Sequence, residues 1–299
     1  MTTIKINRQG GLGDVAMALC AAHAIHENGY GVELVTHPDY HLLASACPFV
    51  SRVSSGGGGA DLNPAKYGLA PIHQVDAYLA DLGFMEPDSN KKTLCITHST
   101  QLVADISNRV LLHPGVGDAN RTWPIEKWAE LARRLRESGR YVALIGKRVD
   151  ESGKGALVLR GYDTHWNLDH VNLMNLMENF GVFVSTDSGP IQLAGATNCS
   201  VVGIYSVVRG NNRLPYRSTL SRGKNYEVSC ACPEHPCYQK MHNEALWALR
   251  GAPALKAGQS LNQVFSEWCV NANDTYGCMH NLSVEAVHAV INKALSPLT

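Results

Sequence analysis

Short apolar runs alternate with amphipathic segments of helical length along most of this 299-residue sequence. In the first unit, an apolar run at 4–7 leads through a glycine-rich turn at 10–14 into a helical segment at 15–29. A second apolar run follows at 31–38. A strand, a crossover helix and a second strand of this kind form a parallel pair in one sheet. The sequence therefore predicts an α/β fold built on parallel sheets.

The same alternation restarts after residue 105, so two units of one kind are expected. They are an N-terminal domain, 1–105, and a C-terminal domain, 106–299, which contains a cysteine-rich segment at 228–280. Further strands are predicted at 92–97, 109–115, 141–146, 181–190 and 200–206. Further helices are predicted at 73–83, 124–139, 170–180, 191–198 and 283–295, the last with Ser283 as its N-cap. Residues 54–64 and 208–281 lack both periodicities and are expected to be irregular.

Charge and hydropathy argue against a nucleic-acid-binding protein of high net charge and against a membrane-spanning protein. Basic and acidic side chains number 26 each, which argues against a protein that binds nucleic acid through its overall charge. Residues 1–105 carry a net −4 and residues 106–299 a net +4, so the second half is the better place for an anion. No apolar stretch approaches the ~20 residues of a membrane span, and no convincing signal peptide is present. We therefore expect a cytoplasmic protein, with peripheral attachment at the inner face of the membrane as the alternative.

Gly11 and Gly13 belong to the turn GGLGD, which follows the first predicted strand. Glycines there let the backbone turn tightly and come close to a ligand. The spacing is not G-x-G-x-x-G, and no acidic residue closes the second strand, so a dinucleotide site is not predicted. Asp14 stands where the turn becomes a helix. It is either a carboxylate that interacts with the helix dipole or a catalytic carboxylate at the mouth of the sheet.

Arg121 follows the strand predicted at 109–115 and stands just before the helix predicted at 124–139. A cation beside a helix start converges with free N–H groups on an anion. This arginine is therefore either an anion-binding residue or an exposed surface residue.

The segment 184–196 runs from a buried strand through Thr-Asp-Ser-Gly-Pro into a helix of small residues. The backbone N–H groups of Ser188 and Gly189 suit a phosphate, and the carboxylate of Asp187 can accept from a hydroxyl. The sequence of this turn, in this position, makes it the most specific feature of the chain.

These three pieces, in this order and spacing, resemble the heptosyltransferase family of sugar transferases, glycosyltransferase family 9. The resemblance is loose over 4–40, close over 109–206, and returns at Cys278-Met279 and the final helix. It implies the GT-B fold, in which two Rossmann-like domains face each other across a cleft, here with an unusually small N-terminal domain. In that family the nucleotide-sugar donor sits on the C-terminal domain and the acceptor on the N-terminal one.

The resemblance also implies roles for individual residues. Asp14 matches the family's general base, and Arg121 stands where the family usually has a lysine that contacts the donor pyrophosphate. The implied donor-binding set is Gly115, Arg121, Gly146, Asp187, Ser188, Gly189 and Gln192, the last standing where the family usually has histidine. The acceptor side of the cleft is expected to include Gly11, Gly13, Arg209 and Arg213, with a solvated loop as the alternative for the two arginines.

The implied activity is transfer of a heptose or hexose from a nucleotide-diphosphate sugar, ADP-linked by the family's habit, to an acceptor hydroxyl. The reaction is expected to be inverting and to need no catalytic metal, because Arg121 and helix N–H groups can stabilise the departing diphosphate. The acceptor is a glycolipid, a protein or a modified base in nucleic acid. One alternative is an inactive nucleotide-sugar-binding or assembly protein with the same fold. A weaker one is an epimerase, for which the dinucleotide fingerprint and a Tyr-x-x-x-Lys pair are both missing.

The nine cysteines fall into two groups. Four are scattered in apolar contexts and are expected to be buried thiols: Cys20, Cys47, Cys95 and Cys199. Five crowd into the C-terminal segment: Cys230, Cys232, Cys237, Cys269 and Cys278. Such a cluster suits a structural iron or zinc ion, which takes four soft ligands, with His235 as a substitute ligand. Disulfides and free thiols are the alternatives.

Overall fold

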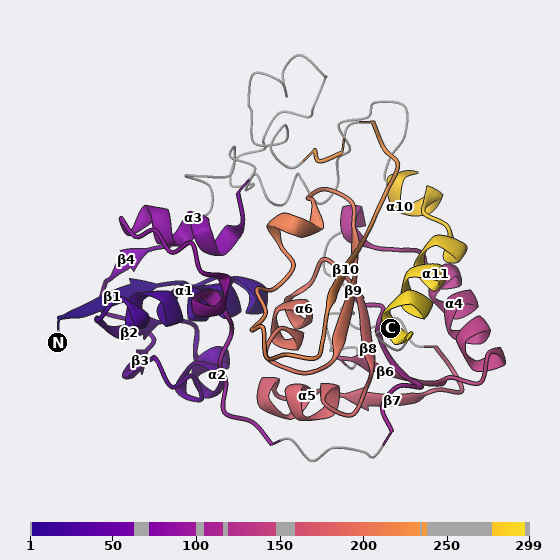
Figure 1. The fold of residues 1–299 in the computed structure, drawn as a ribbon, viewed down its shortest axis with the longest axis horizontal. Coiled ribbons are helices and arrows are strands. Elements are labelled where there is room, and N and C mark those ends of the chain that lie inside the picture. The colour runs from indigo at the N-terminus through magenta and orange to yellow at the C-terminus, as the bar shows by residue number, and fades with distance from the viewer. Residues whose placement is uncertain are drawn as a thin grey trace.

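The structure, a computed structural model, describes residues 2–62, 72–99, 105–115, 119–147, 159–233, 235–237 and 277–296. It is an α/β protein with one parallel sheet in each half of the chain (Figure 1). The strands are β1 (Thr3–Asn7), β2 (Gly31–Val35), β3 (Arg52–Ser54), β4 (Ala60–Asp61), β5 (Arg109–His113), β6 (Tyr141–Gly146), β7 (Asp163–Trp166), β8 (Val182–Thr186), β9 (Ser200–Tyr205) and β10 (Asn225–Ser229). The helices are α1 (Leu12–Glu27), α2 (His41–Ser45), α3 (Gln74–Asp81), α4 (Ile125–Glu137), α5 (His170–Met177), α6 (Gly189–Ala194), α10 (Gly277–Asn281) and α11 (Val284–Leu295).

Both sheets contain a point at which the direction of winding reverses. The N-terminal sheet has the order β3-β2-β1-β4, and the C-terminal sheet has the order β10-β9-β8-β5-β6-β7. The chain therefore winds away from β1 and returns beside it as β4, and it does the same with β5 and β8. Ligands of open α/β sheets bind at the carboxyl ends of the strands beside such switch points. The topology thus marks two places for a site, one on each half.

The C-terminal sheet is covered on both faces, which explains its apolar strands. Along β5 and β8, Leu111 and Phe183 face one apolar cluster, while Val110 and Val182 face another under α4 and α11. Near-continuous apolar runs are the pattern of a parallel sheet buried on both sides. Figure 1 shows α4 and α11 on the face of this sheet away from the N-terminal half, with α5 and α6 on the near face.

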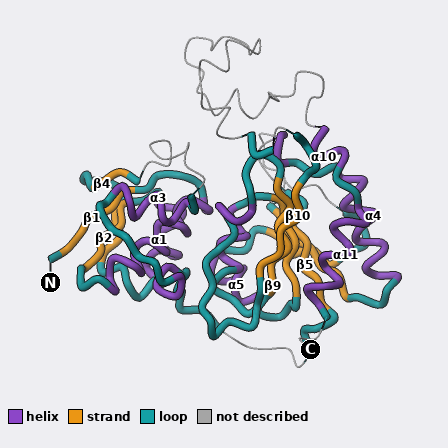
Figure 2. The backbone as a smooth tube through the Cα atoms, turned by 45° about the horizontal axis from the view of Figure 1, so that its top comes forward, coloured by secondary structure: helices purple, strands orange, loops and turns teal. Residues whose placement is uncertain are grey.

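Helix α1 is buried around its whole circumference from Val15 to Ile25. A helix with no polar face must be covered on all sides. It packs against its own sheet and against α6 of the other half, and it lies between the two sheets in Figures 1 and 2. The apolar cluster around it contains Ile6 and Phe183, so one core extends through both halves.

The starts of α1 and α6 meet at two glycines. A Cβ atom on Gly189 would lie 2.8 Å from the Leu12 Cβ and 3.0 Å from the Gly13 nitrogen. A Cβ on Gly13 would lie 3.3 Å from the Gly189 Cα. Each helix follows the strand at its own switch point, so this contact brings the two switch points together.

Helix α3 makes a second connection between the halves. The Nε2 atom of His73 is 2.8 Å from the carbonyl oxygen of Leu214, and Tyr216 donates to the Asp76 carboxylate at 2.6 Å. Burial lowers the pKa of His73 to about 4, and its Nδ1 accepts from the backbone N–H of Val75. The ring is therefore neutral and carries its proton on Nε2, which donates to Leu214.

Most of the predicted elements are confirmed with small changes at their ends, including Ser283 as the N-cap of α11. The strand predicted at 92–97 is wrong. Residues 94–97 have no regular secondary structure and pair with no strand among the described residues, and Leu94 and Ile96 pack against the core around α1. The segments 54–64 and 208–281 were predicted to be irregular, but they contain β4, β10 and α10. Within the described ranges, no helix combines the length and apolar character needed to cross a membrane.

We predict that Gly189→Ala lowers the melting temperature by about 2–6 °C, because the added methyl group forces α1 and α6 apart in a packed junction. Gly11→Ala is the matched control at the same junction, since a Cβ there meets nothing within 4 Å and its backbone is extended. Thermal unfolding of both variants checks this, and equal melting temperatures would contradict it.

Candidate functional site

Asp14 lies at the switch point of the N-terminal sheet, in the first turn of α1. Its Oδ1 is 2.8 Å from an Arg8 guanidinium nitrogen and accepts from the Tyr78 hydroxyl at 3.3 Å. Its Oδ2 accepts from the backbone N–H of Gly11 at 3.2 Å. The side chain is 30% exposed, so this carboxylate caps the helix and also remains open to a ligand.

Arg8 follows β1 and bridges the switch point, because it also donates to the carbonyl oxygen of Leu62 after β4 at 3.0 Å. Burial lowers the pKa of Arg8, but Tyr78 and Asp14 outweigh burial and raise it. Tyr78 is almost fully buried in α3, and burial followed by the Asp14 charge raises the pKa of its phenol. The Arg8 guanidinium therefore stays charged beside the Asp14 carboxylate.

Arg121 and Asp187 meet at the switch point of the C-terminal sheet. Arg121 Nη1 donates to the Asp187 carbonyl oxygen at 2.9 Å and lies 3.4 Å from its Oδ2. The Arg121 side chain is 28% exposed and that of Asp187 is 17% exposed. The alternative of an exposed surface arginine is therefore wrong, and the structure places this cation beside the turn at the start of α6.

The hydroxyl of Ser188 is turned away from the helix that it precedes. It is the N-cap of α6 but makes no side-chain capping bond. Its Oγ lies 2.8 Å from the Oγ of Ser185, which lies 2.9 Å from the Nδ1 of His113 at the end of β5. Burial lowers the pKa of His113 to about 4, so the ring is neutral. This chain of polar groups crosses the switch point beneath the turn and fixes the Ser188 hydroxyl.

The other predicted donor-side residues lie at the same edge of the sheet. Gly146 ends β6, and Gly115 follows β5 by two residues. Gln192 is buried, and its amide nitrogen donates to the carbonyl oxygen of Arg213. The Gln192 side chain therefore holds the segment after β9 in place.

The two arginines predicted on the acceptor side have different surroundings. The Arg213 charge opposes the rise in the pKa of Tyr78, so it lies near the group around Asp14. Arg209 is exposed, and it contributes, after burial and Glu227, to the shift of the pKa of His235. Arg213, rather than Arg209, thus acts on the pKa of a residue that contacts the carboxylate at the first switch point.

Four of the five cysteines of the cluster lie in the described residues, and two of them, Cys230 and Cys278, form a hydrogen-bonded pair. Cys278 hydrogen-bonds to Cys230 and, as the largest cause, lowers the pKa of the Cys230 thiol to about 7. Cys269 lies outside the described residues, and within them no group of three or more metal-binding side chains is present. None of the eight described cysteines forms a disulfide. Cys20, Cys47 and Cys199 are buried as predicted, whereas Cys95 is partly exposed.

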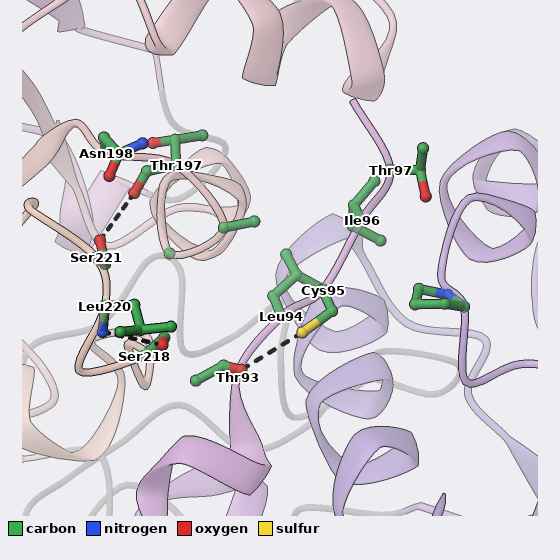
Figure 3. A pocket seen from close by; sticks show the side chains of 13 residues that line it. Thr93, Leu94, Cys95, Ile96, Thr97, Thr197, Asn198, Ser218, Leu220 and Ser221 are labelled. Atoms are coloured by element: carbon green, nitrogen blue, oxygen red, sulfur yellow. Dashed lines mark hydrogen bonds between the residues drawn. The ribbon is translucent and has the colours of Figure 1, made fainter. Parts of the chain in front are cut away.

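A cavity of about 380 Å³ lies elsewhere between the halves (Figure 3). Thr93 and Cys95 line it from the N-terminal half, and Thr197, Asn198 and Ser221 line it from the C-terminal half. Residues 197 and 198 follow the carboxyl end of α6 and precede β9. This cavity is therefore at the opposite edge of the sheet from the turn with Asp187, and the site does not include it.

Sequence reasoning missed four polar residues of the site: Arg8, Tyr78, His113 and Ser185. Arg8 and His113 stand at the ends of the first strand of each half, and that position is a signal that could have found them. Tyr78 has no such signal, because it lies in a helix 64 residues beyond Asp14.

Comparisons with known proteins agree on one family. A family model described as Glycosyltransferase family 9 (heptosyltransferase) matches residues 75–244, more than half of the chain. Among curated proteins, none matches this sequence significantly.

Solved structures show the same fold at low sequence identity. The iron-containing dodecameric glycosyltransferase TibC of enterotoxigenic E. coli H10407 matches with a TM-score of 0.70 at 17% identity, over 98% of this chain and 78% of that chain. TibC in complex with ADP-D-beta-D-heptose matches with a TM-score of 0.69 at 17% identity, over 98% of this chain and 77% of that chain. The E. coli heptosyltransferase WaaC with ADP matches with a TM-score of 0.58 at 14% identity, over 98% of this chain and 100% of that chain. The predicted GT-B fold is confirmed.

Proposed function

Because this chain belongs to glycosyltransferase family 9, the heptosyltransferase family, we propose that it transfers a sugar from a nucleotide-diphosphate sugar to an acceptor hydroxyl. The observation that carries the proposal is the contact of the two switch points through Gly13 and Gly189. Gly13 directly precedes Asp14, and Gly189 ends the Asp187–Gly189 turn, so the contact supports a site shared by the two halves. A base on one side and an anion-binding turn on the other are what glycosyl transfer requires.

The C-terminal half holds the donor in this proposal. Arg121, fixed on the Asp187 backbone, and the N–H groups at the start of α6 stabilise the diphosphate as it leaves. Gly115 and Gly146 leave room for the nucleotide at the ends of β5 and β6. These groups supply the positive charge that a metal would otherwise supply, so the reaction runs without a catalytic metal.

The N-terminal half supplies the base. Asp14 takes the proton of the acceptor hydroxyl while the acceptor oxygen forms a bond to the anomeric carbon. The bond between that carbon and the diphosphate oxygen breaks, and the nucleoside diphosphate leaves with the electron pair. Attack opposite the leaving group inverts the anomeric centre. The ligands named for TibC and WaaC, ADP-D-beta-D-heptose and ADP, make an ADP-linked heptose the first donor to test.

We predict that one nucleoside diphosphate, ADP first, raises the melting temperature of the wild type and fails to do so in Arg121→Ala. A ligand at 100 times its dissociation constant stabilises a protein by about 2.7 kcal/mol. A thermal-shift screen of ADP, GDP, UDP and CDP with their sugars checks this. Arg133→Ala is the control, since Arg133 pairs with Glu130 and Glu137 on the exposed face of α4. No shift with any nucleotide would contradict the donor site.

We predict that Asp14→Asn lowers ADP release from ADP-D-beta-D-heptose about 10²–10⁴-fold while the donor still raises the melting temperature. The amide keeps the shape of the carboxylate but cannot take the proton. Release is measured with water as the acceptor, so the natural acceptor is not needed. A variant that retains the wild-type rate would show that Asp14 is not the base and would favour a different catalytic group.

The cysteine-rich segment carries a second, structural proposal. We infer that Cys230, Cys232, Cys237, Cys269 and Cys278 include the ligands of an iron or zinc ion. Cys230 and Cys278 are 48 residues apart in sequence, yet their thiols are hydrogen-bonded, and thiolates are the ligands that both metals accept. The ion would join the segment after β10 to α10, and the iron-containing TibC is similar in fold. It would supply no chemistry to the transfer step.

We predict about one equivalent of iron or zinc per chain in protein purified without chelator, and its loss in Cys230→Ser and Cys278→Ser. Elemental analysis checks this under anaerobic handling. Cys95→Ser is the control, because that partly exposed cysteine lies in the N-terminal half. Less than a tenth of an equivalent in the wild type would overturn the metal proposal and leave the transfer proposal untouched.

A further inference from the structure

The carboxylate of Asp14 is held unequally at its two oxygens. An ionised carboxylate offers about two acceptor positions on each oxygen. Oδ1 receives both Arg8, at 2.8 Å, and the hydroxyl of Tyr78, at 3.3 Å. Among the described residues, the donor to Oδ2 is the backbone N–H of Gly11, at 3.2 Å. Oδ1 is therefore saturated, and Oδ2 keeps one position for a further donor.

The groups that hold Oδ1 are themselves fixed. Arg8 has its other terminal nitrogen on the carbonyl oxygen of Leu62 and lies 5.7 Å from the centre of the Tyr78 ring. Tyr78 is 1% exposed, so its hydroxyl cannot turn to water. The orientation of the Asp14 carboxylate thus depends on two side chains from separate parts of the chain.

Other ionisable groups also face this carboxylate. Tyr40, at the end of a short helical turn before α2, has its pKa raised by burial first and then by Asp39 and Asp14. The charge of Arg213, from the segment after β9, opposes the rise in the Tyr78 pKa. Arg8 and Tyr78 contact the carboxylate directly.

We propose that Tyr78 is a positioning residue for the transfer reaction, which with Arg8 occupies Oδ1 of Asp14 and so directs the acceptor proton to Oδ2. The proposal rests on the proposed function, in which Asp14 is the base. In the step, the acceptor oxygen bonds to the anomeric carbon, the bond from that carbon to the diphosphate breaks, and the acceptor proton moves to Oδ2. Tyr78 neither gains nor loses a proton.

The test is Tyr78→Phe, which removes one hydroxyl from a buried side chain. We expect ADP release from ADP-D-beta-D-heptose to fall about tenfold, the order of one hydrogen bond to a charged group. The acidic limb of kcat/KM against pH moves up by about half to one pH unit, because the carboxylate loses a donor that stabilises its charged form. The dissociation constant of the donor stays unchanged, since Tyr78 lies on the acceptor side.

Tyr216→Phe is the matched control. Tyr216 also donates to an aspartate, Asp76 of the same helix α3, but it does not touch Asp14. Its loss weakens the docking of α3 without removing a donor from the base. We expect a lower melting temperature and an acidic limb in the wild-type position. If both variants move the limb equally, α3 packing rather than the hydroxyl is responsible, and the proposal fails.

A second replacement covers the case in which Tyr78→Phe does not fold. Incorporation of 3-fluorotyrosine at position 78 keeps the side-chain volume and makes the hydroxyl a stronger donor. The acidic limb then moves to lower pH, and an unmoved limb overturns the proposal. Asp14→Asn distinguishes failure of the proposed function from failure of the inference about Tyr78. If Asp14→Asn still releases ADP, Asp14 is not the base. If Asp14→Asn loses ADP release while Tyr78→Phe keeps the wild-type rate and pH profile, only the role of Tyr78 is wrong.

Discussion

The close approach of α1 and α6 at two glycines is the constraint on which the geometry of the site depends. A side chain on Gly189 would overlap Leu12, so the two helix starts can meet only where both residues lack a Cβ. Each helix leaves the carboxyl edge of its own sheet at the switch point. Contact between the helices therefore orients both edges toward the same place, and the apolar cluster shared by the halves keeps them there.

Each half brings one arginine–aspartate pair to this meeting point. Arg8 pairs with Asp14 in the N-terminal half, and Arg121 lies against Asp187 in the C-terminal half. The two contacts differ: Arg8 lies 2.8 Å from its partner's carboxylate, whereas Arg121 donates to the Asp187 carbonyl oxygen at 2.9 Å and lies 3.4 Å from the carboxylate. A guanidinium that bonds to a neutral carbonyl keeps more of its charge for a diphosphate than one that pairs with a carboxylate. This difference agrees with an anion-binding role for the second half, as its net +4 suggested.

The sequence predicts the parts of the fold that carry strong periodicity and fails where elements are short. Helix α4 and strand β8 have clear patterns because each has a large apolar face. β4 is two residues long and exposed, and no pattern can be read from two residues. The apolar alternation at 92–97 is real, but it reflects burial against α1, and burial alone does not distinguish a paired strand from a segment without regular secondary structure.

The candidate site could likewise be predicted only in part from the sequence. Asp14, Arg121 and Asp187 could be predicted because each stands next to a turn after a strand, and the topology requires such turns to gather at one edge. The contact of Tyr78 with Asp14 could not, because it depends on how α3 folds back over α1.

Helix α3 links the chemistry of one half to the position of the other. Its N-cap, His73, donates to Leu214; Asp76, one turn on, receives Tyr216; and Tyr78 reaches Asp14. Lys92 reinforces the middle contact, since it bonds to Asp76 at 2.8 Å and lies 4.5 Å from the centre of the Tyr216 ring. A shift of the C-terminal half relative to α3 would therefore pull on the same helix that orients the carboxylate. Helix α3 thus contacts both the Asp14 carboxylate at the first switch point and the C-terminal segment that follows β9.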